Sequence, residues 1–209
     1  MNAKEIQDDI IKTIIKPRFK ENRFKVSGLT LLKKEVDFVK VFNIQSSSWN
    51  TADEVKFTFN LGFFLPDTYE FWLGQPVPQN IKEYHCVFNL RPGPILKSGT
   101  NDYWYSINES RNLEELKNLI RAHVKTYYIP FFNKYNLITD LINLGEIDST
   151  YYNMLTPHLA LILAKKGNHE LAEELISNYL KNGEYPDNWI KKLESEAKKV
   201  NLKIKDYNR

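Results

Sequence analysis

Polar side chains that could build a site gather on three segments of alternating polar and apolar residues. Residues 38–45, 55–63 and 84–91 each show the two-residue period of a β-strand. If their apolar faces share one core, the opposite face collects Asn43, Gln45, Ser47, Thr58, Asn60, His85, Asn89 and Arg91. Amides and a guanidinium on rigid strands are suited to hydrogen bonding with a peptide or a small polar ligand.

Two tryptophans, at positions 49 and 104, could form the walls of this candidate site. The proposed ligand-binding residues are therefore Asn43, Gln45, Trp49, Asn60, His85, Asn89, Arg91 and Trp104. A solvated outer face, which antiparallel sheets commonly have, is the alternative explanation of the same pattern. Amides in place of the usual Lys, Glu and Thr favour a function. Arg91, which precedes Pro92-Gly93-Pro94, is the first side chain to test.

The histidines and the cysteine form no recognisable catalytic or metal site. The four histidines lie far apart in the sequence and lack metal-ligand spacing. Cys86 alternates with Tyr84 and Phe88 on the apolar face of its strand, which predicts a buried, unreactive thiol. The chain has no Gly-rich phosphate loop, HExxH motif or GxSxG motif. We assign no catalytic residue, no metal ligand and no cofactor.

A basic segment near the start of the chain suggests a different kind of partner. Residues 12–34 contain eight Lys or Arg side chains and a single acid, Glu21. Phe19 and Phe24 are interleaved with them, and such a stripe could follow a phosphate backbone. No recognition-helix or RNA-binding signature accompanies the stripe. A solvated basic face is therefore the preferred interpretation, and we do not expect a nucleic-acid partner.

Composition is typical of a folded, soluble protein. The chain has 209 residues, of which 42% are hydrophobic, and its net charge is +3. Cys86 is the only cysteine, so no intrachain disulfide can form. The first residues lack the apolar stretch of an export signal, and no apolar run approaches the length of a membrane span. We expect a cytoplasmic protein without a membrane partner.

The order of elements predicts the fold class. The spacing predicts an amphipathic helix over residues 3–15, ended by Pro17. Strands are expected at 24–26, 30–34, 38–45, 55–63, 84–91 and 103–107, with a loop at 65–83. Helices are expected from Asn112 until Pro130 disrupts the pattern, at about 136–144, and from Thr156, Asn168 and Asp187.

Separate blocks of strands and helices indicate an α+β fold. We expect an antiparallel β-sheet of about five or six strands packed by an N-terminal helix and a mid-chain helix, followed by a C-terminal block of α-helices. The predicted domains are a sheet domain over residues 1–150 and a helical extension over 151–209 that packs on it.

Three motifs carry a resemblance to a known family. FNIQSSSW (42–49), FTFNLGFF (57–64) and FNLRPG (88–93) together resemble the bacterial domain of unknown function 4304 family over about residues 5–135. The resemblance implies this fold and a bacterial origin, and it carries no activity. Residues 164–176, AKKGNHELAEELI, resemble the paired helices of tetratricopeptide-type arrays. Only one such pair is present, whereas a solenoid needs about three repeats.

These observations favour a non-enzymatic module that binds a protein or a peptide, for example an immunity-type or accessory protein. The amide-rich sheet face and the C-terminal helices are the two candidate surfaces. One alternative is an enzyme or binder of a small polar ligand, with Arg91 holding an anionic group and His85 as acid or base. The other alternative is a weak nucleic-acid binder that uses residues 12–34. The sequence does not indicate an oligomeric state.

Overall fold

The structure is a computed structural model that describes residues 2–109, 112–147 and 149–204. Its contacts divide the chain into two compact units. The sheet unit comprises residues 1–64 and 80–136, and the helical unit comprises residues 65–79 and 137–209. This division does not test the predicted domain boundary near residue 150. That boundary, and the packing of residues 151–209 on the sheet domain, stay predictions.

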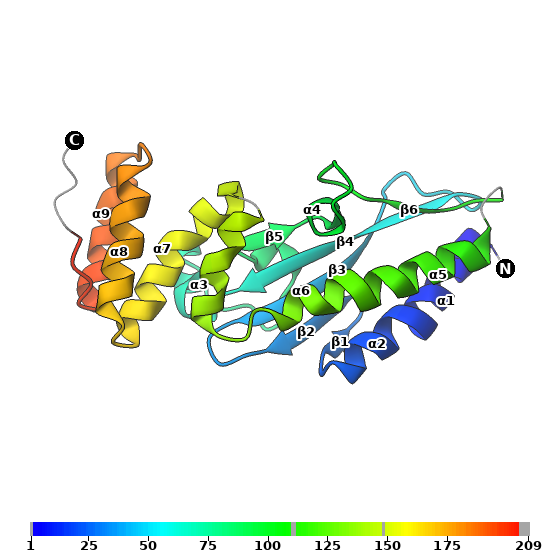
Figure 1. The fold of residues 1–209 in the computed structure, drawn as a ribbon, viewed down its shortest axis with the longest axis horizontal. Helices are drawn as coiled ribbons and strands as arrows, with labels where there is room; N and C mark the ends of the chain where they lie inside the picture. Colours follow the sequence, from blue (N-terminus) through cyan, green and yellow to red (C-terminus); the bar gives the residue numbers. More distant parts are fainter. Residues whose placement is uncertain (1, 110–111, 148, 205–209) are drawn as a thin grey trace. The chain divides into compact units, whose positions relative to one another are not determined.

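The sheet unit is built on one antiparallel sheet of six strands (Figure 1). In spatial order these are β1 (Lys25–Ser27), β2 (Thr30–Lys34), β3 (Val39–Ser46), β4 (Val55–Phe64) and β5 (Phe88–Leu90), with β6 (Tyr105–Ile107) also on β4. Since β3 occupies one edge of β4, β5 and β6 share the other. There β5 pairs with residues 61–63 and β6 pairs with residues 55–57. The predicted α+β class with an antiparallel sheet is confirmed.

The register of β3 with β4 gives the sheet two chemically different faces. On one face the opposed pairs are Phe42–Leu61 and Ile44–Phe59, and on the other they are Asn43–Asn60 and Gln45–Thr58. Side chains alternate across a strand, so each face keeps its character along the whole pairing. The predicted separation into an apolar face and an amide face is confirmed for these two strands.

Two long interrupted helices lie side by side over the apolar face (Figure 1). The first runs through α1 (Ala3–Ile10), η1 (Ile11–Ile15) and α2 (Lys16–Glu21), and the second through α5 (Leu113–His123), η3 (Val124–Tyr128) and α6 (Ile129–Asn133). Aromatic rings join both helices to the sheet. Phe19 of α2 lies over Phe42 with ring centroids 4.2 Å apart, and Tyr128 of η3 meets Phe59 at 5.3 Å.

Neither Pro17 nor Pro130 ends its helix, so the prediction that the first helix stops before Pro17 is wrong. Each proline is the second residue of an α-helical segment that directly follows a π-helical turn, η1 or η3. A proline inside a helix donates no backbone hydrogen bond and clashes with the carbonyl four residues earlier. The π-turn, in which Lys16 N–H bonds to Ile11 O, adds one residue to the turn and relieves this clash.

One charged side chain is buried on the apolar face. Lys40 is fully buried, with its Nζ 2.7 Å from Glu35 Oε1 and donating to Asn136 Oδ1 at 2.9 Å. A buried ammonium is costly unless it is paired and hydrogen-bonded. Lys40 therefore fixes the turn before β3 and the segment that follows α6 against the same end of the sheet.

The chain between β4 and β6 differs most from the prediction. Residues 65–83, expected to be a loop, contain α3 (Pro66–Leu73), which ends at Gly74 with φ 64°. The strand expected over 84–91 is shortened to β5 because η2 (Glu83–His85) forms a 3₁₀ turn before it. In that turn the N–H of Cys86 donates to Glu83 O. The helix α4 (Pro92–Leu96) then separates β5 from β6.

The helical unit contains α3 and four later helices. These are η4 (Ile138–Glu146), α7 (Ser149–Lys165), α8 (His169–Lys181) and α9 (Asp187–Lys199). A helix start at Thr156 was expected, but α7 begins at Ser149 and contains Pro157 internally. The predicted turn at Gly167 is present, with φ 83° and a bond from Asn168 N–H to Leu163 O. No helix in the described part of the chain is long and apolar enough to cross a bilayer.

A buried polar contact joins α3 to α7 within the helical unit. Thr68 Oγ1 and His158 Nδ1 lie 2.6 Å apart, and both side chains are buried. Burial lowers the pKa of His158 well below its usual 6.5, because the charged imidazolium is poorly solvated there. His158 is therefore neutral in the folded protein at pH 7.

We expect stability to fall as the pH drops below about 6.5. The unfolded chain then takes up a proton at His158 that the folded chain does not, so each pH unit costs up to about 1.4 kcal/mol until the folded pKa is reached. Urea unfolding between pH 5 and 7.5 measures this slope. His158→Asn should reduce this slope, whereas the matched His169→Asn change on α8 should leave it unchanged. An unchanged slope in His158→Asn would contradict the assignment.

Candidate functional site

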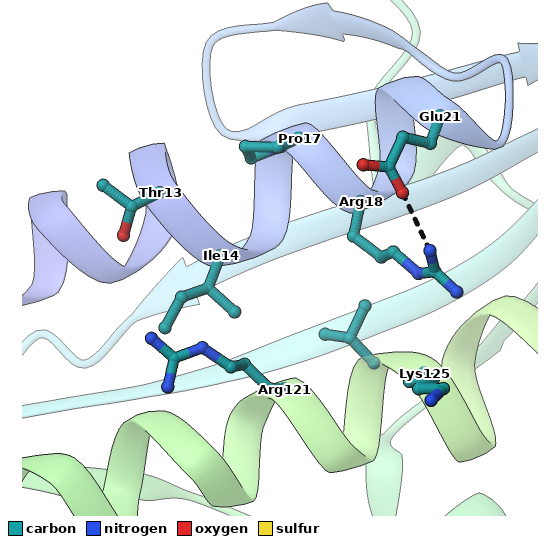
Figure 2. A pocket seen from close by; sticks show the side chains of 8 residues that line it. Thr13, Ile14, Pro17, Arg18, Glu21, Arg121 and Lys125 are labelled. Carbon is teal, nitrogen blue, oxygen red and sulfur yellow. Dashed lines mark hydrogen bonds and ion pairs between the residues drawn. The ribbon is translucent and has the colours of Figure 1, made fainter.

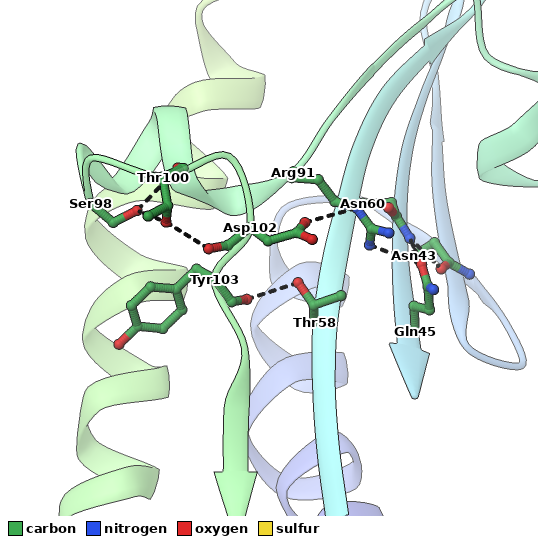
Figure 3. A network of polar contacts seen from close by, with 9 residues as sticks. All are labelled: Asn43, Gln45, Thr58, Asn60, Arg91, Ser98, Thr100, Asp102 and Tyr103. Carbon is green, nitrogen blue, oxygen red and sulfur yellow. Dashed lines mark hydrogen bonds and ion pairs between the residues drawn. The ribbon is translucent and has the colours of Figure 1, made fainter. Parts of the chain in front are cut away.

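Four of the predicted site residues form one hydrogen-bonded network on the amide face of the sheet (Figure 3). Asn60 of β4 donates from Nδ2 to Asn43 Oδ1 at 3.1 Å and to Gln45 Oε1 at 3.0 Å. Arg91, directly after β5, donates from Nη1 to the same Gln45 oxygen at 2.9 Å. The register brings the amides together, because Asn43 lies opposite Asn60 and Gln45 lies two residue pairs further along, on the same face.

Arg91 is held from a second side by Asp102, a residue with no signal in the sequence. The Arg91 Nε lies 3.2 Å from Asp102 Oδ1, and its Cζ lies 6.0 Å from the ring centre of Trp104. Two acceptors therefore orient the planar guanidinium. The side chain of Arg91 is 33% exposed and Trp104 is 36% exposed. This end of the network reaches solvent.

The centre of the amide face is covered by the chain itself. Thr58 is 0% exposed and Asn60 is 3% exposed. The Thr58 hydroxyl donates to the carbonyl oxygen of Tyr103 at 2.8 Å, which ties the segment before β6 to the sheet (Figure 3). The face is thus neither an open platform nor an ordinary solvated surface at its centre. Access remains at the Arg91 and Trp104 end.

Two glycines allow neighbouring segments to approach closely: Gly62 faces Cys86, and Gly93 faces the loop at residues 100–101. A Cβ at Gly62 of β4 would lie 2.8 Å from Cys86 Sγ, which is closer than real Cβ contacts allow. A Cβ at Gly93 would overlap the carbonyl oxygen of Thr100, and the Gly93 N–H donates to Asn101 O at 3.0 Å. Gly93 therefore fixes the loop that carries Asp102.

The prediction that Cys86 lies on the apolar face is wrong. The turn η2 takes residues 83–85 out of the strand alternation, and Cys86 then lies against Gly62 on the amide side. Its Sγ donates to Lys82 O at 3.8 Å. Burial raises the pKa of the thiol well above its usual range. An unreactive thiol, which was predicted for a different location, fits this environment too.

Trp49, His85 and Asn89, which were also predicted as site residues, take no part in the hydrogen bonds of the network. Trp49 lies in the turn between β3 and β4 and is 90% exposed. His85 does not lie on a strand face as predicted; in η2 its Nδ1 accepts from Lys82 N–H at 3.0 Å, and burial lowers its pKa. Asn89 faces Gly62 from β5 as expected, and its buried Oδ1 has no hydrogen-bond partner among the described residues.

A second group of hydrogen-bonded polar side chains lies on the apolar face of the sheet, between β6 and the helix that runs through α5 and η3. Tyr105 of β6 places its hydroxyl 2.7 Å from His123 Nδ1 and 2.7 Å from the Tyr128 hydroxyl. Burial raises the pKa of both tyrosines and lowers the pKa of His123. These groups satisfy one another within the aromatic core, so they anchor β6 to α5 and η3.

The chemistry of the amide network suits recognition. Its members are neutral amides and an ion pair, and neither amides nor a guanidinium transfer protons near neutral pH. The Nη2 atom of Arg91 has no hydrogen-bond partner among the described residues and can donate to a carbonyl or a carboxylate. Within residues 2–109, 112–147 and 149–204, no three His, Cys, Asp or Glu side chains are grouped as metal ligands.

Asn60→Asp should destabilise the sheet unit by at least about 2 kcal/mol. The change keeps the size of the side chain but turns a buried donor into a charged acceptor that faces two other acceptors. Chemical unfolding at pH 7 measures the loss. Asn101→Asp, the same change at an exposed position, is the control and should cost less than about 0.5 kcal/mol. Equal losses would show that the network does not depend on the Asn60 donor.

One comparison with known proteins identifies a family. The model described as "Domain of unknown function (DUF4304)" matches residues 15–134, which is more than half of the chain and includes every residue of the amide network. Searches of curated proteins and of solved structures give no match. The sequence motifs at 42–49, 57–64 and 88–93 all fall inside the matched range. This chain belongs to the DUF4304 family.

Proposed function

We propose that this chain is a non-enzymatic module that binds a protein or peptide partner at the exposed end of the amide network. The observation that carries the proposal is the guanidinium of Arg91, oriented by Gln45 and Asp102 beside the ring of Trp104. Arginine and tryptophan dominate the energetics of many protein interfaces. The Arg91 guanidinium is already oriented by two acceptors, so binding would lose little of its conformational entropy.

The Nη2 atom of Arg91 sets the chemistry of the partner. It offers hydrogen-bond donors that no described residue uses, next to an aromatic surface. A peptide carbonyl or an acidic side chain satisfies such donors, and a hydrophobic neighbour of that group could rest on Trp104. The covered centre of the face behind Arg91 acts as a rigid support.

The proposal also includes a cellular compartment and a second binding surface. The single free cysteine suits a reducing bacterial cytoplasm. The antiparallel pair formed by α7 and α8, joined at Gly167, is similar to a tetratricopeptide-type helix pair and could contact the same partner. An immunity-type or accessory role, in which the chain neutralises its partner, is the specific form that we propose. A neighbouring gene for a toxic protein would support it.

Affinity capture from the native host with the full chain tests the proposal. A partner should be recovered and should form a complex of fixed stoichiometry in size-exclusion chromatography with light scattering. Arg91→Gln and Trp104→Ala should each weaken that complex at least tenfold, because tenfold corresponds to about 1.4 kcal/mol and hot-spot residues contribute more.

Trp49→Ala is the matched control, because Trp49 is an exposed tryptophan outside the network. It should leave the complex unchanged. Circular dichroism of each variant establishes that the fold is kept. Repeated recovery of the chain alone would overturn the proposal, as would a partner that binds all three variants equally well.

A further inference from the structure

Two seven-residue segments, far apart in the sequence, share a pattern and fold alike. IKTIIKP at 11–17 and VKTYYIP at 124–130 both begin with a β-branched residue, Lys and Thr and both end in Pro. Each forms a π-helical turn that leads into the α-helical segment holding the proline. Such turns are rare and are frequent at functional sites. Here they lie on neighbouring helices over the same sheet face.

A groove of about 420 Å³ lies between the two helices at these turns (Figure 2). Ile14, Pro17 and Val124 provide its apolar surface, and the first and last of these side chains are buried at its base. An ion pair between Lys117 and Asp9, 2.9 Å apart, ties α5 to α1. The volume falls in the range of small-molecule sites.

Positive charge lines the groove in excess. Arg18 comes from α2, and Arg121 and Lys125 come from α5 and η3 (Figure 2). The single carboxylate, that of Glu21, is 2.8 Å from the guanidinium of Arg18. Arg121 and Lys125 have no ion-pair partner among the described residues, and Arg121 donates only to the neutral Asn118 amide at 2.8 Å. The sequence gives no sign that these two cations join the basic segment at residues 12–34.

We propose that this groove binds a small organic phosphate, such as a nucleoside diphosphate. Arg121 and Lys125 would hold the phosphate, because a guanidinium pairs with two phosphate oxygens and an ammonium adds a point charge. The carbon skeleton would rest on Ile14 and Val124. The size of the groove favours a small ligand over a polymer. The site lies on the helix-covered side of the sheet, so it does not depend on the function proposed for Arg91.

Calorimetric titration of the full chain with ADP, with inorganic pyrophosphate and with a single-stranded oligonucleotide tests the inference. ADP should bind, pyrophosphate should bind more weakly, and added salt should weaken both. The double change Arg121→Glu and Lys125→Glu should reduce ADP affinity at least tenfold. Lys20→Glu, a charge reversal on α2 outside the groove, is the control and should change it less than twofold.

A second measurement needs no variant. In amide NMR spectra of the wild-type chain, ADP should shift the signals of residues 11–21 and 121–128 and leave those of β3 and β4 near Asn60 unchanged. Absence of ADP binding would overturn the proposal. Binding of the oligonucleotide but not of ADP would overturn the small-ligand site in favour of a polyanion-binding surface. Equal binding of ADP and pyrophosphate would show that the apolar floor of the groove, formed by Ile14 and Val124, does not contribute.

Discussion

The pairing of β3 with β4 is the interaction on which the rest of the sheet unit depends. Eight opposed residue pairs hold it, from Val39 with Phe64 to Ser46 with Phe57. The pairing puts an aromatic surface on one side, where both long helices dock, and the amides on the other side. A slip by one residue would turn Asn43 toward the aromatic core and leave the helices without their apolar contact surface. Both candidate sites inherit their geometry from this register.

The sequence predicted these two faces well because a strand has a strict period of two. Alternation alone was enough to align Asn43, Gln45 and Asn60, and to point to Arg91 at the end of the next strand. It could not predict Asp102 or the covering segment, because loop contacts follow no period. The close approach of Gly93 to residues 100–101 and the hydrogen bond from Thr58 to Tyr103 are tertiary contacts, which form only when the chain has folded. Hence the three amides and Arg91 were predictable, whereas Asp102 and the burial of the network were not.

Other expectations failed where a local interaction outweighed a sequence pattern. The alternation of Tyr84, Cys86 and Phe88 imitates a strand, but backbone hydrogen bonds within 82–86 close a 3₁₀ turn instead. The loop expected at 65–83 contains Pro66, which instead begins α3, and the helix start expected at Thr156 precedes Pro157, which instead lies inside α7. A proline requires only a missing donor and space for its ring, and several helical contexts provide both.

The π-turns before Pro17 and Pro130 also determine the rotational phase of the helix that follows. A regular α-helix advances about 100° per residue, since it has about 3.6 residues per turn. The residue added in each turn therefore sets the direction in which Phe19 and Phe132 project, and both are fully buried in the aromatic core. The number of residues within 11–15 and 124–128 thus sets the rotation of the following helical segment about its axis. Loss of a single residue there would rotate the following helical segment by about 100° and turn its buried ring away from the aromatic core.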